Sequence, residues 1–584
     1  MMHFKSLLLL LSLGVSSVFS QGPIPTNGES LLEYKKLQHL NIKKQFGGIS
    51  VVDKDSLILK FDTKEQPKFI YELSAMFPTK SFQPKEKQVY LLAFDAITTK
   101  SSLETGEAKL SCILKQSNSY KDNMIQTISI ASKWQTYYVP YKTTIVPNPN
   151  EFSMVFQFGY RPQTLLMKNI KFIKFPENIK ISDLPKTQIK YAGMKKNAAW
   201  RNEANDRIKK IRKGTVELVF TDEDDKPLKD TQINVVLSKH SFPFGAAINA
   251  DEVLNNPAQY SFFKKTFNTA VFENDTKIKS WHRIKNRERV LNAIEVLRQD
   301  GIRLKGHVLV WPGFSYLPKE VEKNKDHPKK VISLIENHVT DIVSKTKGKF
   351  SSWDVVNEAY TNKDLQEITG SEQIIYNAFK EVKKLDSSIA RFTNEYGIIS
   401  KGGIDTQKQK WYYDFVKRID EHTNGLVDGV GIQCHMGTDL TPPTKVLSII
   451  DYYSQLKKDI SISEFTMEID DEEIRYQYTR DFMIAAFSKP NVSEFLFWGY
   501  HQDKNNKAAF YNKQGRMTAM GAAFYSLVHK EWKTVENFKT NEKGSYELKG
   551  FYGTYEYKLL VNDKIHTGTF NLEEGCDKKI KIKL

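Results

Sequence analysis

Three zones of different hydrophobic pattern divide this chain. Between about residues 30 and 180, short runs alternate apolar and polar side chains, with turn residues between them, at 56–61, 88–94, 124–130, 135–139 and 153–158. Alternation with a period of two is typical of half-buried β-strands. Many short strands joined by turns favour a β-sandwich, which we place at residues 21–185.

The pattern changes after residue 244. Amphipathic stretches with helical spacing occupy 287–300, 328–345, 371–385 and 407–422. Short apolar runs lie between or beside them, at 301–310, 353–356, 391–393, 427–432, 460–463 and 495–498. Repeated βα units of this kind predict a (β/α)8 barrel, which we place at residues 244–530.

The segments on either side of the barrel are each too small to hold a core alone. We expect a linker with a helix at residues 186–213 and a β-hairpin at 214–243. Residues 531–584 return to short strands with glycines at the turns. The hairpin and this tail are expected to pair into one accessory β-module. The predicted fold class is therefore multidomain, with an all-β sandwich, a barrel and a small β-module.

The first twenty residues have the pattern of a secretory signal. A short basic start with His3 and Lys5 precedes an apolar core at 7–15, and small residues at 18–20 offer a cleavage site before Gln21. The apolar core is too short to span a bilayer. We therefore expect residues 1–20 to be removed, the protein to be secreted, and no membrane span to remain.

Charge and cysteine content add little to this picture. The formal net charge is +17, but the lysines are dispersed and no basic run is interleaved with aromatic residues. This pattern argues against a nucleic-acid partner, while a modest attraction to acidic polysaccharide stays open. Cys112, Cys434 and Cys576 lie far apart without metal-ligand spacing, so we expect no structural disulfide. No signature of an oligomer is visible.

Two carboxylates carry the clearest chemical signal. Glu358 ends the apolar, β-prone run at 352–357, and Glu464 ends a similar run at 460–463. The carboxyl ends of parallel barrel strands meet at one mouth, where the chemistry of such barrels takes place. Two carboxyl groups gathered there suit hydrolysis of a glycosidic bond, with one as proton donor and the other as nucleophile.

Polar and aromatic residues end other predicted strands. His307 and Trp311 lie at the end of one, Gln433 and His435 at the end of another, and Trp498 at the end of the last. Taken alone, each of these residues would more often have a packing role. Their common placement at strand ends instead indicates groups that surround a substrate.

At this point the barrel segment resembles the glycoside hydrolase family 10 endo-β-1,4-xylanases. The resemblance spans 244–530 and rests on the ordered motifs at 272–277, 306–311, 353–358 and 431–435 together with Glu464. It implies that Glu358 is the general acid/base and that Glu464, at the end of the seventh strand, is the nucleophile. It also implies a set of sugar-binding residues: Glu273, Asn274, Lys277, His307, Trp311, Asn357, Tyr396, Gln433, His435 and Trp498.

Three features depart from the family pattern. Pro312 follows Trp311, Glu395 stands where an aspartate is usual, and residues 500–502 differ after the last tryptophan. The segment 272–277 resembles the motif of the family's first strand and loop. None of the departures removes a catalytic group, so we expect them to change sugar contacts.

The sandwich resembles carbohydrate-binding modules of families 22 or 4/9 through its strand pattern and its place before the barrel. Its candidate stacking residues are Trp134, Tyr137, Tyr138, Phe158 and Tyr160. The alternative is that these side chains form the sandwich core, since alternation turns some of them inward.

The resemblance as a whole implies a secreted, retaining endo-1,4-β-xylanase that acts on xylan or a related β-1,4-linked plant polysaccharide without metal or cofactor. Two alternatives stay open. One is a β-1,4-glycanase that cuts mixed-linkage glucan or cellobiosides on the same site. The other is a non-catalytic carbohydrate-binding protein.

Overall fold

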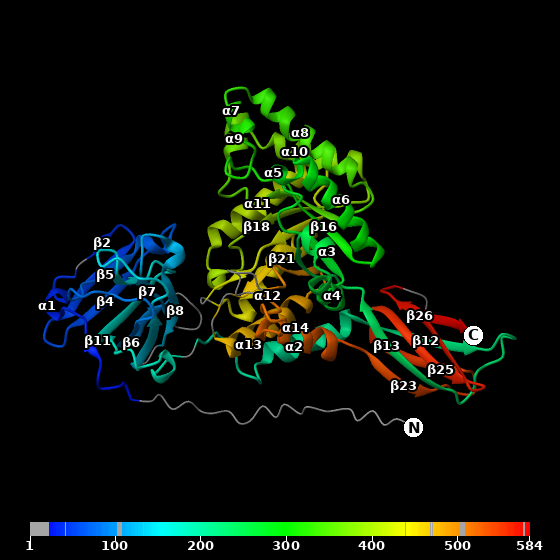
Figure 1. Cartoon of the computed structure of the whole chain (residues 1–584), viewed down its shortest axis with the longest axis horizontal. Coiled ribbons are helices and arrows are strands. Elements are labelled where there is room, and N and C mark those ends of the chain that lie inside the picture. The colour runs from blue at the N-terminus through cyan, green and yellow to red at the C-terminus, as the bar shows by residue number, and fades with distance from the viewer. Residues whose placement is uncertain are drawn as a thin grey trace. The chain divides into compact units, whose positions relative to one another are not determined.

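A computed structural model describes most of the chain, in two units. The described residues are 23–40, 42–101, 108–131, 134–187, 189–437, 440–467, 469, 471–501, 509–575 and 578–584. The expected signal at 1–20 and Cys576 lie outside them. The units are Met1–Ile189 and Lys190–Leu584 (Figure 1). Within the described residues, no helix is both long and apolar enough to cross a membrane.

The first unit is a β-sandwich of two sheets, joined by short turns and one short helix, α1 (Tyr34–Leu37). The larger sheet has the order β2-β3-β4-β11-β6-β9, with β1 beside β11. Its strands are β1 (Glu29–Ser30), β2 (Lys43–Lys44), β3 (Gly47–Asp53), β4 (Ile58–Thr63), β6 (Val89–Ser101), β9 (Gln135–Lys142) and β11 (Gln163–Lys174). The smaller sheet, ordered β5-β10-β7-β8, contains β5 (Ser74–Phe77), β7 (Ala108–Lys115), β8 (Met124–Ile130) and β10 (Ser153–Gln157).

Aromatic side chains fill the space between these two sheets. Phe156 of β10 has its ring 6.0 Å from that of Phe61 and 5.7 Å from that of Phe94, both on the facing sheet. Edge-to-face pairs of this kind add to the burial of apolar area. The inward halves of the alternating strands therefore form one core, as the alternation predicted.

Three of the five proposed stacking residues of the sandwich belong to this core. Tyr137, Phe158 and Tyr160 are buried, so the expectation that they offer a surface to sugars is wrong. Their positions on alternating strands turn them inward, and the hydroxyl of Tyr160 lies 2.7 Å from that of Ser111. Trp134 is 41% exposed, and Tyr138 is half-buried.

The two described cysteines are buried and free. Cys112 lies in β7 of the sandwich and Cys434 at the mouth of the barrel, in the second unit. Burial raises the pKa of both thiols well above the ordinary value, which keeps them protonated.

The second unit is built around a closed barrel of eight parallel strands. They are β14 (Phe244–Ile248), β15 (Thr269–Phe272), β16 (Arg303–Val310), β17 (Ser352–Asn357), β18 (Ala390–Glu395), β19 (Gly429–Ile432), β21 (Asp459–Met467) and β22 (Val492–Phe497). Pairing of β14 with β22 and of β19 with β21 closes the ring, and the short β20 (His435–Met436) adds beside β21. The predicted (β/α)8 barrel is confirmed.

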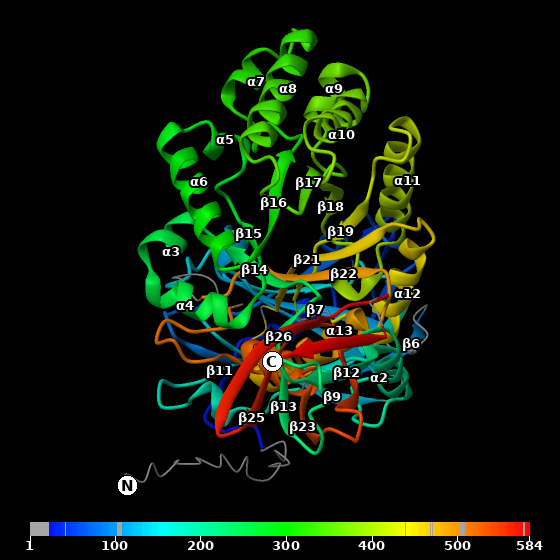
Figure 2. The same ribbon diagram turned by 90° about the vertical axis from the view of Figure 1, so that its right-hand side faces the viewer.

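Helices cover the outside of the barrel, as Figure 2 shows for α6, α8, α10 and α11 around β16, β17 and β18. Their apolar faces turn inward; in α10, Ile375, Phe379 and Val382 are buried. The helices after β14 are α3 (Ala250–Asn255), α4 (Pro257–Thr266), α5 (Ile278–Trp281), α6 (Ile284–Gln299), α7 (Lys319–Lys323), α8 (Pro328–Lys345), α9 (Asp364–Thr369), α10 (Gln373–Leu385), α11 (Thr406–His422), α12 (Pro443–Ser454), α13 (Glu472–Phe487) and α14 (Ala519–Ser526). A π-helical turn, Leu527–Glu531, follows α14, and the linker helix α2 (Ala199–Ile211) precedes the module.

The segments that flank the barrel form a two-sheet module, but not through a hairpin. β12 (Lys213–Thr221) pairs with β24 (Ser545–Phe551) and β27 (Lys579–Lys583). β13 (Gln232–His240) pairs with β23 (Val535–Lys539) and β25 (Gly553–Val561), and β26 (Lys564–Leu572) continues that sheet. The expected hairpin at 214–243 is therefore wrong. Separate sheets let Phe220 of β12 pack on Phe538 and Tyr557 of the facing sheet, which buries more apolar area than a lone hairpin.

Deleting residues 535–584 is expected to lower the thermal midpoint by about 5 °C or more, because β12 and β13 lose their partner strands. A differential scanning calorimetry scan of the truncated and full chains measures the shift. Deleting only the last strand from residue 578, a milder change, should lower the midpoint less. An unchanged midpoint in the larger deletion would contradict the pairing of the tail with these strands.

Candidate active site

Glu358 and Glu464 lie at the carboxyl-terminal mouth of the barrel. Glu358 directly follows β17, and Glu464 lies within β21. The backbone of Glu358 has a φ of +53°, in the left-handed region, which turns the chain sharply out of the strand. Its N–H donates to the carbonyl of Asn394 at the end of β18, at 2.9 Å. This bond fixes the backbone of Glu358 at the rim of the mouth.

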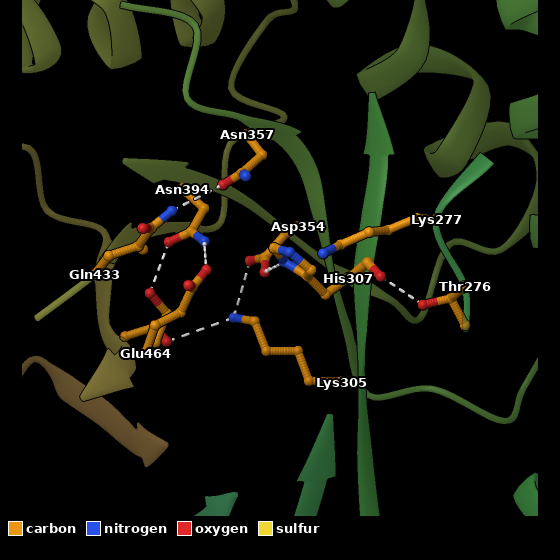
Figure 3. A network of polar contacts seen from close by, with 12 residues as sticks. Thr276, Lys277, Lys305, His307, Asp354, Asn357, Asn394, Gln433 and Glu464 are labelled. Atoms are coloured by element: carbon orange, nitrogen blue, oxygen red, sulfur yellow. Dashed lines mark hydrogen bonds and ion pairs between the residues drawn. The ribbon is translucent and has the colours of Figure 1, made fainter. Parts of the chain in front are cut away.

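The carboxylate of Glu464 is held by two donors, of which Figure 3 shows Asn394. The amide of Asn394 donates to Oε1 at 2.7 Å, and Nε2 of His435 lies 3.1 Å from Oε2. Ser463 Oγ donates to Asn394 Oδ1 at 2.6 Å, which fixes which end of the amide faces Glu464. Glu464 is 4% exposed, so these bonds orient a carboxylate that is almost fully buried.

Glu358 has a different environment. Burial raises the pKa of its carboxyl; a hydrogen bond from Gln433 Nε2 opposes that effect, and the charge of Glu464 adds to it. The Gln433 bond is 3.1 Å long, and the same nitrogen lies 3.2 Å from Asn357 Oδ1. Because the two carboxylates have different surroundings, they can serve as an acid and a nucleophile.

A buried network of charges supports His307 from below. Nδ1 of His307 lies 2.9 Å from Asp354 Oδ2, and Lys305 Nζ lies 3.2 Å from Asp354 Oδ1. Lys305 Nζ also lies 2.6 Å from Glu494 Oε1. Burial lowers the pKa of Lys305, but Asp354 and Glu494 outweigh it and the pKa is raised overall. Lys305 therefore stays charged and keeps Asp354 available to orient the ring of His307.

Aromatic and polar side chains form one wall of the mouth. Lys277 Nζ donates to Asn274 Oδ1 at 2.8 Å and lies 5.0 Å from the ring centre of Trp311. Trp311 stacks on Tyr316 with ring centres 3.6 Å apart. Burial lowers the pKa of Lys277, against the charges of Glu464, Glu273 and Glu358. The charges of Glu464 and Glu358 thus both act on this amine.

At the end of β18, the mouth is held by a buried ion pair between Glu395 and Lys408, at 2.9 Å. Oε1 of Glu395 accepts from the N–H of Tyr396, and Oε2 accepts from the N–H of Tyr360. Lys408 Nζ lies 3.2 Å from the ring centre of Tyr396. Burial raises the pKa of Glu395 to about 7, although Lys408 opposes the shift. Glu395, which departs from the family pattern, thus positions Tyr396.

Every residue expected to bind substrate lies at or near this mouth. Asn357 and Gln433 are buried; His435, Lys277, Trp311, Tyr396 and Trp498 are half-buried; Glu273 and Asn274 are exposed. The ring of Trp498 lies 5.0 Å from that of His307.

The segment 272–277 follows β15, the second barrel strand, so its assignment to the first strand is wrong. β14 is only five residues long and precedes it.

Sequence reasoning gave no role to several residues of the site. Lys305, Asp354, Asn394, Lys408 and Glu494 all contact the groups described above. Lys305, Asp354 and Glu494 could have been found from sequence, because each is a charged residue inside a predicted buried strand. Burying a charge is costly unless it is paired, so such residues are expected to form ion pairs. Within the described residues, no cluster of three or more His, Cys, Asp or Glu side chains has the arrangement of a metal site.

A family model and several known proteins match parts of this chain. The family model of glycosyl hydrolase family 10 matches residues 233–518. The anti-sigma-I factor RsgI6 of Acetivibrio thermocellus is 30% identical over 388 residues, covering 64% of this chain and 49% of that protein. Endo-1,4-beta-xylanase 1 of Arabidopsis thaliana is 26% identical over 361 residues, covering 60% of this chain and 37% of that protein. The chain thus spans half or less of the length of these curated relatives.

Among solved structures, xylanase 10B from Thermotoga petrophila RKU-1 in complex with xylobiose is similar to this chain. The two share 21% identity with a TM-score of 0.45, over 50% of this chain and 94% of that one. The family model covers the barrel strands and every predicted site residue. The barrel segment of this chain therefore belongs to glycosyl hydrolase family 10.

Proposed function

We propose that this protein is a retaining endo-1,4-β-xylanase that cuts internal bonds of xylan. The observation that carries the proposal is the pair of glutamates at one barrel mouth, one clamped by donors and the other with a raised pKa. The names of several relatives, such as the Arabidopsis xylanase, support xylan as the substrate. The arrangement matches the division of labour in hydrolysis with retention.

The first step joins the substrate to Glu464. Its carboxylate attacks the anomeric carbon while Glu358 gives its proton to the leaving oxygen, and a glycosyl ester forms. The donors Asn394 and His435 hold the attacking carboxylate in place, so little motion is needed at the moment of reaction. The raised pKa of Glu358 keeps the proton available for the departing sugar.

The second step releases the sugar. Burial is the main cause of the raised pKa of Glu358, and the charge of Glu464 adds to it; once the ester has formed, that charge is gone, so Glu358 becomes more acidic. It then acts as a base towards an incoming water, which displaces Glu464. Two displacements at the same carbon give net retention of configuration.

Two unsatisfied donors support our placing of the sugar at this mouth. Nδ2 of Asn357 and Nε1 of Trp311 are buried without a hydrogen-bond partner among the described residues. A buried donor without a partner is costly, so hydroxyl groups of a bound sugar would stabilise both. Asn357 directly precedes Glu358, which supports a role for its amide near the bond to be cut.

Release of reducing ends from xylan tests the activity. We expect the full chain to act on xylan far faster than on mixed-linkage glucan or aryl cellobiosides, and the products to include internal fragments. Higher activity on glucan would overturn the substrate class while keeping the reaction. No release from any β-1,4-glycan would leave a binding protein and sink the proposal.

Replacing Gln433 by leucine is expected to raise the pKa of Glu358 further, because a hydrogen bond that lowers it is lost. Glu358 must be protonated in the first step, so activity falls as pH rises through this pKa. The basic limb of kcat/KM should therefore move to higher pH, and kcat should fall by roughly tenfold. The exposed Gln299 replaced by leucine is the control. A basic limb that stays in place or moves to lower pH would contradict the role of Gln433.

We also propose that the sandwich at 21–185 binds carbohydrate. Besides Trp134, it exposes Phe69 and Tyr71, which are 45% and 57% exposed and stack on each other with ring centres 5.2 Å apart. Parallel rings at a surface offer apolar faces against which sugar C–H groups pack. Retention of residues 21–185 on insoluble xylan tests this, with Trp134→Ala and the pair Phe69→Ala and Tyr71→Ala as variants. Equal retention on an inert resin would end the proposal.

Secretion through removal of residues 1–20 is a further proposal, supported by the sequence pattern alone. Mature protein recovered from the medium of the producing cells should begin at Gln21. Exported protein that still carries residues 1–20 would contradict this proposal.

A further inference from the structure

A groove lies at the end of the barrel opposite to the catalytic mouth. One cavity of about 380 Å³ is bordered by the residues that begin β16 and precede β15 and β17, namely Arg303, Asn268 and Ser351, and by Lys239 of the module strand β13. A neighbouring cavity of about 170 Å³ shares Lys239 and Asn268 with it. The two cavities together, here called the basic groove, run along the junction of barrel and module.

Cations dominate the lining of the basic groove. The seven Lys and Arg side chains that line it are Lys239, Lys264, Lys265, Arg298, Arg303, Lys349 and Lys533. Among the described residues that line it, Asp300 is the one carboxylate. Asp300 already accepts from Tyr260 at 2.7 Å and from Lys264 at 3.3 Å. The groove therefore carries a surplus of positive charge that its own walls do not neutralise.

The cations of the groove differ from many others on the barrel. Elsewhere, lysines such as Lys410 and Lys489 each pair with an aspartate on the barrel surface, at 2.6 Å in both cases. Within the described part of the chain, Arg298 and Arg303 form no ion pair with a carboxylate. Among the described cations lining the first cavity, Lys349 is the one that forms such a pair, with Glu295. Burial, then the nearby charge of Arg303, lowers the pKa of Lys239. Like charges held together in a concave site favour an anionic occupant.

We propose that the basic groove binds a chain of carboxylate-bearing sugars, an acidic polysaccharide. Cations spread over two adjoining cavities suit a polymer with repeated charges better than a single small anion. The phenylalanines of the lining, Phe244, Phe267 and Phe350, are buried, and its two histidine rings, His240 and His529, are half-buried, so the groove offers no fully exposed ring for stacking a nucleic-acid base. The groove lies away from the catalytic mouth, so both sites can be occupied at once.

Binding at the groove would hold the protein on an acidic polymer while the opposite end stays open to substrate. This goes beyond the proposed hydrolysis and does not depend on it. His240 adds no charge to the groove at neutral pH, because burial lowers its pKa to about 4. Burial also lowers the pKa of His529, the other histidine of the lining. Lysine and arginine side chains ordinarily titrate well above neutral pH, so we expect affinity to be flat between about pH 6 and 8 and to fall with added salt.

The test measures binding of the full chain to polygalacturonate by affinity electrophoresis and by titration calorimetry. The groove variant carries Arg298→Glu and Arg303→Glu, and the matched control carries Lys558→Glu and Lys564→Glu, two exposed residues of the module that do not line the groove. Both double variants change the net charge equally. We expect the groove variant to lose about tenfold or more in affinity and the control less than about twofold. Xylan hydrolysis should be unchanged in both.

Three results would overturn the proposal. The first is equal affinity of the two variants, which would reduce the binding to general charge. The second is no retention of the unaltered chain by polygalacturonate at low salt. The third is tighter binding to single-stranded DNA than to polygalacturonate, with the same loss in the groove variant. If the glutamate variant is unfolded by circular dichroism, Arg298→Gln with Arg303→Gln replaces it, and the same comparison with the control decides.

Discussion

Replacing Glu464 by glutamine is expected to lower kcat on xylan by about 10⁴-fold or more, because an amide cannot form the glycosyl ester. The amide has nearly the same shape as the carboxylate, so Asn394 and His435 should still hold the side chain in place. The thermal midpoint should therefore change little. Initial rates of reducing-end release, measured at matched protein concentration, give the loss.

A second variant shows which role Glu464 has. Glu464→Ala leaves space for a small anion at the position of the carboxylate. With added azide and an activated aryl xylobioside, the anion attacks the anomeric carbon directly, and Glu358 is still present. Because only one displacement takes place at the anomeric carbon, the product is an α-glycosyl azide, whose configuration is inverted relative to the β-linked substrate. The product is identified by proton NMR.

The exposed Glu288 of α6 provides the matched control, because it lies on the outside of the barrel and forms no ion pair with a residue that the structure describes. Glu288→Gln should keep full activity. Activity of Glu464→Gln within tenfold of the unaltered chain would remove Glu464 from the nucleophile role. A β-glycosyl azide from Glu464→Ala would instead assign it the acid/base role.

The positions of both glutamates could be predicted from sequence because each comes directly after a β-prone run. β17 and β21 are buried on both faces, and although both strands also contain other polar residues, Glu358 and Glu464 are the carboxylates that stand where these runs reach the mouth. The amphipathic stretches at 328–345 and 407–422 became α8 and α11 almost to the residue. Periodicity predicts such elements well because each buries one clear face.

The supporting residues were harder to find, since their roles depend on contacts between strands. The backbone carbonyl of Asn394 accepts a hydrogen bond from the N–H of Glu358, and its side-chain amide donates to Glu464. These bonds link β17, β18 and β21, and no local sequence pattern indicates them. Lys305 pairs with Glu494, which lies 189 residues away along the chain. The expected hairpin at 214–243 failed for the same reason, because each strand found its partner in a tail three hundred residues later.

Replacing Glu358 by alanine is expected to have an effect that depends on the leaving group. On xylan, whose leaving sugar needs a proton, kcat should fall by about 10³-fold. On a dinitrophenyl xylobioside, whose leaving group needs no proton, the first step should stay fast and the second should become slow for lack of a base. The glycosyl ester on Glu464 should then accumulate, giving a burst of dinitrophenol followed by a slow steady state.

The pH profile and azide rescue separate Glu358 from Glu464. In the unaltered chain, activity falls as pH rises through the pKa of Glu358, which burial and Glu464 raise. In Glu358→Ala, that basic limb should vanish for the activated substrate, because no proton is required. Azide should enter where the base had directed water and attack the ester, giving a β-glycosyl azide by double displacement. If Glu358→Ala gives the α-azide and Glu464→Ala the β-azide, the two roles are reversed; if neither variant responds to azide, this pair of carboxylates does not carry the reaction.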